Sequence, residues 1–363
     1  MNLPIISIIV PIYNPPCEMF RQCIHSVQEA MALVPTGFVE CVFVNDGSTE
    51  SYVDEILKTF DGSFRYIKID NEGVSAARNI GMEQALGTYL MFVDADDWIE
   101  LNALQYCLKI IDESQADVIY MRHVNGGHRP EKPQWQEFIE GEEGIRQFII
   151  EMTAGNAEAS NHGINTYSVS AKLYRKELIE SCQQQFDPQM IVAEDFLFNL
   201  HVLASPYCKS LYFSNKLVYH YVYNNKSVTR SYSNLRLRTT LLTLSRLEDY
   251  LYSCMDGSTK FEKAIHYQLL KSIEICMRTY FVHPLNKMSV SRKFQELHKY
   301  LSEPIIQRWI KKLTWNDGAN WKKRRDICLL RLHLYWILLL TEPTKRRFVS
   351  QKMRFMRNLG KKQ

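Results

Sequence analysis

Apolar runs of strand length alternate with stretches of helical spacing through the first 120 residues of the chain. The apolar runs are rich in β-branched and aromatic residues and occupy residues 5–13, 39–44, 64–69 and 89–93. The helical stretches between them occupy residues 17–31, 50–60 and 74–85. Strands that read as nearly continuous apolar runs are buried on both faces. The pattern therefore predicts an α/β fold, Rossmann-like, with a mostly parallel sheet and helices on both faces.

The regular alternation is interrupted after residue 120. Residues 121–165 are polar and contain several Gly and Pro residues, so we expect them to form an insert or a mobile loop. The α/β pattern resumes at residues 165–174, followed by a short helix around 175–181 and a second helix from about Glu194.

The pattern becomes helical after Tyr232. The chain is longer than one ordinary domain, which agrees with a second, smaller part. We therefore expect an α/β domain at residues 1–232 and an α-helical C-terminal region at residues 233–363.

Polar residues follow the ends of the predicted strands. Tyr13, Asp46 and Asn71 each come just after an apolar run, and the segment from Asp94 to Asp97 follows the last of these runs. Ligands of open α/β sheets bind beyond the carboxyl ends of the strands. We therefore expect these side chains to line one crevice.

Three carboxylates, those of Asp94, Asp96 and Asp97, fall together at the end of one strand. Like charges at this spacing repel one another unless a cation lies among them. Mg²⁺ and Mn²⁺ prefer carboxylate oxygens and can bridge a protein to a diphosphate. The cluster therefore indicates phosphate-ester chemistry. The alternative is a solvated acidic turn that ends the strand and caps the next helix.

Composition narrows the class of protein. An apolar fraction of 46% and a charged fraction of 23% are typical of a soluble globular chain. The nine cysteines include no Cys-x-x-Cys pair, which favours reduced thiols over disulfides or a zinc site. The opening residues lack the charged region of a signal peptide, so we expect the site to face the cytoplasm.

Basic residues are concentrated in the tail at residues 321–363, which holds 13 Lys and Arg against two acids. Within the tail, the apolar stretch 327–340 is too short and too interrupted to cross a bilayer. Its basic flanks and its Tyr and Trp fit an interfacial helix attracted to anionic lipid. The alternative is a packed helix with a solvated basic end. No nucleic-acid-binding motif accompanies the charge, so we expect no nucleic-acid partner.

Five motifs occur in a fixed order along the chain. They are Ser7-Ile8-Ile9-Val10-Pro11-Ile12-Tyr13-Asn14, Asn45-Asp46-Gly47-Ser48-Thr49, Asn71-Glu72-Gly73-Val74-Ser75-Ala76-Ala77-Arg78-Asn79, Asp94-Ala95-Asp96-Asp97 and Ala193-Glu194-Asp195. Together they resemble family 2 of the glycosyltransferases, bacterial surface-polysaccharide type, which has the GT-A fold. The resemblance covers residues 4–232. Neither a dinucleotide-binding Gly-x-Gly-x-x-Gly after the first strand nor a P-loop is present.

The resemblance implies a nucleotide site. Its expected members are Pro11, Tyr13, Asp46, Asn71, Arg78, Asp94 and Arg230. A carboxylate at Asp46 can accept the imide N–H of uracil, which favours a UDP-sugar donor. The alternative for Asp46 is an Asx-turn before Gly47, and for Arg78 a surface position on a helix.

The resemblance also implies a metal site and a catalytic pair. Asp96, together with Asp94, is expected to hold Mn²⁺ or Mg²⁺. Asp195 is expected to act as general base and Glu194 to orient the sugar. Consecutive acids at a helix start are also favoured by the helix dipole alone.

A segment at residues 219–230 resembles the part of the family that closes over the diphosphate, with Arg230 as the phosphate contact. His220 in this segment is either a third metal ligand or a structural histidine.

These expectations define a metal-dependent, inverting glycosyltransferase, hexosyl- or N-acetylhexosaminyl-transferring. It would move a sugar from a nucleotide diphosphate to a glycan or lipid-linked acceptor hydroxyl. It would be cytoplasmic and peripheral on the inner face of the membrane. One alternative is a sugar-phosphate nucleotidyltransferase, whose glycine-rich, Arg-containing loop after the first strand is replaced here by Pro11 to Pro16. The other is a catalytically silent sugar-binding or membrane scaffold protein on the same fold.

Overall fold

The chain is described by a computed structural model at residues 3–125, 132–190, 192–223, 232–318 and 320–341. It divides into two compact units, unit 1 at Met1–Asn225 and unit 2 at Lys226–Gln363. Each unit is described by itself.

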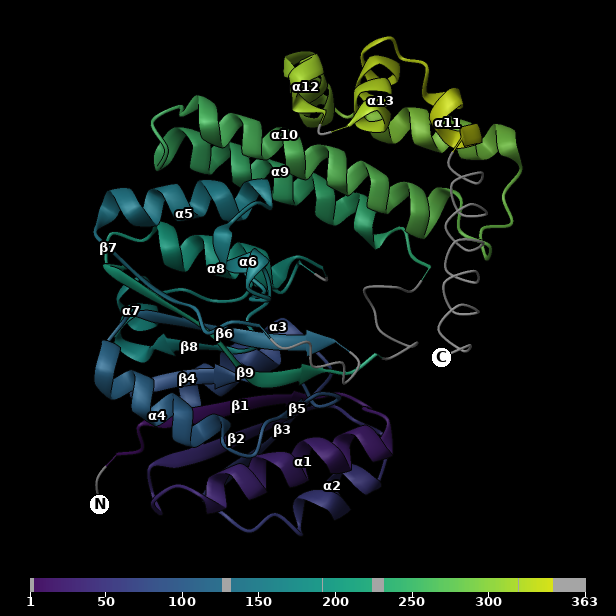
Figure 1. Ribbon diagram of the computed structural model, residues 1–363. Coiled ribbons are helices and arrows are strands. Elements are labelled where there is room, and N and C mark those ends of the chain that lie inside the picture. Colours follow the sequence, from purple (N-terminus) through teal and green to yellow (C-terminus); the bar gives the residue numbers. More distant parts are fainter. Residues whose placement is uncertain (1–2, 126–131, 191, 224–231, 319, 342–363) are drawn as a thin grey trace, which may run out of the picture. The chain divides into compact units, whose positions relative to one another are not determined.

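Unit 1 is built on one nine-stranded sheet with the order β3-β2-β1-β4-β8-β6-β9-β5, in which β7 pairs with β9 (Figure 1). The strands are β1 (Ile6–Ile12), β2 (Val39–Asp46), β3 (Phe64–Ile69), β4 (Tyr89–Phe92), β5 (Trp98–Ile99), β6 (Val118–Asn125), β7 (Gln136–Glu140), β8 (Lys172–Arg175) and β9 (Ser210–Tyr221). β1 pairs in parallel with both β2 and β4, and β2 pairs in parallel with β3. β8 runs antiparallel to β4 and β6.

Burial along the strands follows their place in the sheet. Every residue of β1 and β2 is buried, as expected of strands covered on both faces. β3 is at the end of the sheet, and its burial alternates from residue to residue. The mostly parallel α/β sheet predicted from the sequence is confirmed.

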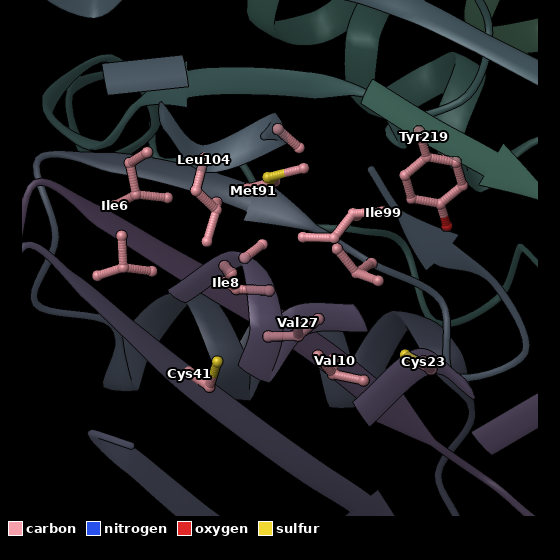
Figure 2. Close-up of a cluster of buried hydrophobic side chains, with 14 of the residues drawn as sticks. Ile6, Ile8, Val10, Cys23, Val27, Cys41, Met91, Ile99, Leu104 and Tyr219 are labelled. Carbon is pink, nitrogen blue, oxygen red and sulfur yellow. The ribbon is translucent and has the colours of Figure 1, made fainter. Parts of the chain in front are cut away.

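Helices cover both faces of the sheet. The helices of unit 1 are α1 (Cys17–Ala32), α2 (Tyr52–Leu57), α3 (Val74–Gln84), α4 (Ala103–Ser114), α5 (Glu142–Ala154), α6 (Glu158–Asn161), α7 (Lys176–Ser181) and α8 (Glu194–Ala204). α1, α2 and α4 contribute buried side chains to the core on the face that carries Ile6, Ile8 and Val10. Figure 2 shows Val27 of α1 and Leu104 of α4 in this cluster. α3 approaches the opposite face, where a Cβ on Gly81 would lie 2.3 Å from Ile9 Cγ2.

The segment at residues 121–165, of which residues 126–131 lie outside the described residues, is for the most part not the mobile loop that was one of the two expectations. It contains the end of β6, then β7, α5 and α6. α5 forms because Ile145, Phe148, Ile149 and Met152 recur at helical spacing and are all buried. Among the described residues, Pro133, Gly141 and Gly155 lie between these elements, so the Gly and Pro content concealed a regular structure.

Unit 2 is helical, as the sequence predicts. Its helices are α9 (Leu235–Ser253), α10 (Thr259–Cys276), a π-helical turn η1 (Met277–Phe281), α11 (Val290–Leu301), α12 (Pro304–Lys312), a 3₁₀ turn η2 (Trp315–Asp317) and α13 (Trp321–Arg331). α9 packs against α10 and α12 around the fully buried ring of Trp309. Among the described residues, none of the helices is both long and apolar enough to span a bilayer.

The apolar stretch 327–340 is not the single interfacial helix that the sequence suggested. α13 ends at Arg331, and His333 adopts a positive φ of 56° that interrupts the helical path. Ile327, Leu330 and Tyr335 are buried, which agrees with the packed alternative. An apolar face that packs inside its own unit is not available to lipid.

Candidate active site

The carboxyl ends of β1 and β2 lie side by side. Parallel pairing aligns Ile12 with Asn45, so the loops after the two strands leave the sheet together. The backbone N–H of Asn14 donates to Ser48 Oγ at 3.1 Å, and the N–H of Thr49 donates to Asn14 Oδ1 at 2.9 Å. These bonds join the two loops into one wall beside the strand ends.

Asp46 connects this wall to the loop that precedes α3. Its Oδ1 accepts the N–H of Glu72 at 2.7 Å, and its Oδ2 accepts the N–H of Gly73 at 3.0 Å. The side chain that bonds to the backbone of the turn is that of Asn45 and not that of Asp46, because Asn45 Oδ1 accepts the N–H of Ser48 at 2.8 Å. Each carboxylate oxygen has a second lone pair, so these bonds leave acceptor capacity at Asp46 for a base.

The other expected nucleotide residues lie along the same edge. Tyr13 follows β1 and is 55% exposed, so its ring is available for stacking. Pro11 is buried within β1. Asn71 follows β3 and is exposed, and its backbone N–H would lie 2.8 Å from a Cβ on Gly47. Arg230 lies outside the described residues.

The three clustered acids after β4 have different surroundings. Asp97 points inward, where its Oδ2 accepts the Tyr219 hydroxyl at 2.7 Å and its Oδ1 accepts the N–H of Val222 at 2.7 Å. Burial and the neighbouring Asp94 raise the pKa of Asp97 to about 8. Asp96 is half-buried and is not held by these bonds. Asp97 therefore anchors β9 to the cluster, whereas Asp94 and Asp96 remain at the strand end.

Arg78 is the centre of the acidic site. Its Nη1 donates to Asp195 Oδ1 at 2.6 Å and to Glu194 Oε1 at 3.3 Å, and its Nη2 donates to Asp94 Oδ1 at 3.0 Å. The arginine side chain is only 4% exposed. Burial alone would lower the pKa of Arg78, but the three carboxylates raise it above its ordinary value. The buried guanidinium thus balances acids from two distant segments of the chain.

The Glu194–Asp195 pair begins α8, as expected. Asp195 Oδ2 accepts the Ser168 hydroxyl at 3.2 Å and the N–H of Val169 at 3.1 Å. Asp195 is therefore held from two sides, by Arg78 and by the segment before β8. Burial and the adjacent Asp195 raise the pKa of Glu194 to about 8. Glu194 therefore keeps its proton to a higher pH than a solvated glutamic acid would.

Asp94 and Asp96 are the expected ligands of a divalent cation, and the described residues contain no group of three or more His, Cys, Asp or Glu side chains that could hold one. Asp94 and Asp96 supply two carboxylates, and Mg²⁺ sites often consist of one or two carboxylates completed by substrate phosphates and water. The ring of His220 stacks on Trp98 at 3.5 Å, and its Nε2 lies 2.5 Å from Glu100 Oε1. This geometry favours the structural role of His220.

The structure adds residues that the motifs did not reveal. They are Ser168 and Asn199, which hydrogen-bond to Asp195, and Lys172, which binds the carbonyl of Asn165 before β8. The role of Tyr219, the first residue of the segment 219–230, as the partner of Asp97 was also not foreseen. The sequence gives a signal for Asn199 alone, because it lies one helical turn after Asp195 and therefore shares its face of α8. Lys172 stands alone in an apolar run and matches no motif.

Comparison with known proteins gives one family model. Residues 7–182 match the model described as Glycosyl transferase family 2. The chain is 42% identical over 117 residues to glycosyltransferase GlyA of Streptococcus pneumoniae, and 32% identical over 207 residues to the uncharacterized glycosyltransferase EpsJ of Bacillus subtilis. These matches cover 31% and 54% of this chain. They span 16% of GlyA and 56% of EpsJ, less than two thirds of either relative.

Solved structures share the fold. The crystal structure of S. aureus TarS 1-349 in complex with UDP-GlcNAc matches with a TM-score of 0.64 at 16% identity. The match covers 94% of this chain and 92% of the TarS chain. The α/β fold with a helical C-terminal region is therefore an architecture already seen in a crystal structure.

Proposed function

We propose that this chain, which belongs to family 2 of the glycosyltransferases, transfers a sugar from a UDP-sugar to an acceptor hydroxyl with inversion at the anomeric carbon. The transfer would be of a hexosyl or N-acetylhexosaminyl group. The observation that carries the proposal is the shared guanidinium of Arg78. It joins the acid at the end of β4, on the expected diphosphate side, to the acidic pair of α8, on the expected acceptor side.

The donor nucleotide would lie along the ends of β1 and β2. Tyr13 offers an exposed ring for stacking, and Asp46 offers acceptor capacity for the imide N–H of uracil. Asn71 would contact the nucleotide from the loop after β3. TarS of Staphylococcus aureus, named poly(ribitol-phosphate) beta-N-acetylglucosaminyltransferase, has been crystallised with UDP and with UDP-GlcNAc. This likeness supports a UDP-sugar for the present chain.

Asp96 and Asp94 would hold Mn²⁺ or Mg²⁺ against the diphosphate. When bound, the ion would neutralise the charge that develops on the departing UDP. Arg78 contacts Oδ1 of Asp94, so the carboxylate is already oriented at the strand end. Arg230 would contact the same diphosphate from a part of the chain outside the described residues.

Asp195 would take the proton from the acceptor hydroxyl as that oxygen attacks the anomeric carbon. A single base without a covalent intermediate gives inversion. The bonds from Arg78, Ser168 and Val169 fix the carboxylate in one orientation, which is what a positioned base requires. Glu194, next to it, would hold the sugar or the acceptor.

We further propose that the acceptor is a glycan or a lipid-linked glycan of a surface polysaccharide, met at the cytoplasmic face of the membrane. The support is the concentration of basic residues at 321–363, which an anionic lipid surface attracts.

Turnover of UDP-sugars tests the proposed reaction. Wild-type protein with Mn²⁺ is expected to release UDP from a UDP-hexose or UDP-N-acetylhexosamine, and Asp195→Asn to reduce kcat by at least about 100-fold, since general bases typically contribute this much. Asp112→Asn, at an exposed position of α4, is the matched control and should leave kcat unchanged. Thermal-shift screening with UDP, GDP and dTDP would separately report the nucleotide preference.

Two outcomes would contradict the proposal in different ways. Binding of UDP without turnover of any UDP-sugar would favour the silent scaffold. A preference for GDP or dTDP would overturn the role of Asp46 while leaving the transferase reaction intact.

A further inference from the structure

A buried lysine lies behind the expected base. Lys172 begins β8 in the middle of the sheet, and the residue is 1% exposed. Its Nζ donates to the carbonyl of Asn165 at 2.7 Å and to the carbonyl of Ser168, and it lies 4.8 Å from the centre of the Tyr120 ring. Among the described residues, it forms no ion pair. Burying an ammonium without a carboxylate partner is costly, so its contacts require an explanation.

The carbonyls that Lys172 binds belong to an irregular segment, residues 165–169. This segment precedes β8 and has no helical or strand ladder of its own, so its backbone groups need other partners. Asn165 Oδ1 accepts the N–H of Tyr167 at 2.9 Å and of Ser168 at 3.2 Å. Asn199 Nδ2 donates to the carbonyl of Tyr167 at 2.8 Å. Lys172 and Asn199 together therefore fix the path of the segment.

The far side of the same segment faces the base. The Ser168 hydroxyl and the Val169 N–H both donate to Asp195 Oδ2, while Arg78 binds Oδ1. The carbonyl of Ser168 thus accepts from Lys172, and its side chain donates to Asp195. A shift of the segment would release one oxygen of the carboxylate from its orientation.

We propose that Lys172 is a positioning residue for the transfer reaction, holding the 165–169 segment so that Ser168 and Val169 orient the Asp195 carboxylate. This inference rests on the proposed function of Asp195. Burial lowers the pKa of Lys172 to about 7, with Asp195 acting in the opposite direction, which agrees with a lysine held for its place in this network.

If Lys172 acts by orienting Asp195, its replacement should lower kcat and leave binding of the UDP-sugar unchanged. Lys172→Met keeps the length of the side chain and removes its donors. It is expected to lower kcat by at least about tenfold, because small misplacements of a catalytic group cost up to about 100-fold. The KM for the UDP-sugar and the Kd for UDP should stay within about twofold, since the expected nucleotide contacts lie elsewhere. Lys172→Gln, which retains a donor, should lose less than Lys172→Met.

A double-mutant cycle tests whether Lys172 acts on kcat through Asp195. In the Asp195→Asn background, Lys172→Met should reduce the residual rate by less than about twofold, because residues that act through a common group are not additive. Ser168→Ala, which removes one donor to Asp195, should show the same dependence on Asp195. Lys176→Met is the matched control. It changes a lysine that pairs with Glu180 on α7 and should leave kcat unchanged.

The outcomes separate this inference from the proposed function. Absence of turnover in the wild type overturns the function itself. Turnover that Asp195→Asn abolishes but Lys172→Met leaves intact overturns the inference alone. Equal losses from Lys172→Met in both backgrounds would also overturn it. So would a failure of both lysine variants to fold, because the lysine would then serve the whole fold and not the base.

Discussion

A single buried residue, Arg78, compensates the charge of several neighbouring acids. Asp94, Glu194 and Asp195 come from segments about 100 residues apart in sequence, and all three contact one buried guanidinium. An uncompensated buried acid is strongly unfavourable. The guanidinium of Arg78 supplies the opposite charge and donates a hydrogen bond to each of the three acids. Arg78 therefore holds acids from distant segments of the chain at one place.

The pKa of Glu194, raised by burial and by the neighbouring Asp195, predicts a pH dependence of stability. The pKa of Glu194 is about 8 in the folded protein against an ordinary value of 4.5. The folded state therefore keeps a proton between these pH values that the unfolded state releases. This contribution to stability is fully present below about pH 4.5 and is lost as the pH rises through about 8.

Glu194→Gln mimics the protonated acid and should remove this dependence. Without donor or metal, its Tm should exceed that of the wild type by at least about 2 °C at pH 9, since 1 kcal/mol shifts the Tm of a domain of this size by a few degrees. At pH 5 the two should agree more closely. Glu180→Gln, at an exposed position of α7, should follow the wild type throughout. Parallel melting curves for Glu194→Gln and wild type from pH 5 to 9 would contradict the expectation.

At the scale of elements, β1, β2 and β4 could be predicted because their burial leaves uninterrupted apolar runs in the sequence. β3, whose burial alternates, could be predicted because it is a short run rich in aromatic and β-branched residues. β9 could not, because polar residues interrupt its centre. The polar groups of those residues have hydrogen-bond partners in distant segments. Ser214 Oγ lies 2.6 Å from the Tyr106 hydroxyl, and Asn215 Oδ1 accepts the N–H of Trp135 at 2.9 Å. Such partners exist only after folding, so the local pattern could not reveal the strand.

The same distinction applies to the candidate site. Asp46, Asp94 and Asp195 could be named because each stands in a motif at an element end. Lys172 could not, because a lone lysine in an apolar run indicates nothing until its Nζ is placed against the carbonyls of a loop. The sequence also could not indicate that Arg78 would face acids, since a helical arginine is most often on the surface.

The loop after β2 gives a prediction at the element scale. Gly47 has a φ of +71°, and a Cβ there would lie 2.8 Å from Asn71 N, the backbone of another loop of the expected nucleotide site. Gly47→Ala should therefore push these loops apart and weaken UDP binding by at least about tenfold, or about 1.4 kcal/mol.

Gly37→Ala is a control that introduces the strain of an alanine at positive φ without a close contact of its Cβ. Gly37 has a similar φ of +86°, but a Cβ there meets nothing within 4 Å. It should cost about 1 kcal/mol in stability through the left-handed backbone alone and leave the Kd for UDP unchanged. Calorimetric titration of both variants measures the difference. Equal Kd values would show that the approach of Gly47 to Asn71 does not shape the nucleotide site.

At the scale of the whole molecule, charge is divided unequally along the chain. The net charge of +4 conceals the basic excess of the tail at residues 321–363. Burial of Ile327, Leu330 and Tyr335 restricts which apolar residues of this tail can meet lipid. Those that remain exposed include Trp321 at 72% and Trp336 at 49%. Attraction to a membrane would therefore depend mainly on charge, with tryptophan at the headgroup level.

Truncation after Thr341 tests this attraction. It removes eight of the 13 basic residues and retains every described residue. Full-length protein should co-sediment with vesicles containing phosphatidylserine, and the truncated protein should lose at least about tenfold in affinity, because each basic residue near an anionic surface contributes about 1 kcal/mol.

Two controls identify the cause. Vesicles of phosphatidylcholine alone should bind neither protein, and raising the salt from about 0.1 to 0.5 M should weaken binding of the full-length chain, because the Debye length shortens. UDP binding should be the same in both proteins, since none of the expected nucleotide residues lies within residues 342–363. Equal sedimentation of the two proteins with anionic vesicles would place the attraction outside residues 342–363. Binding that is insensitive to salt would mean that the exposed tryptophans, and not the charge, hold the protein at lipid.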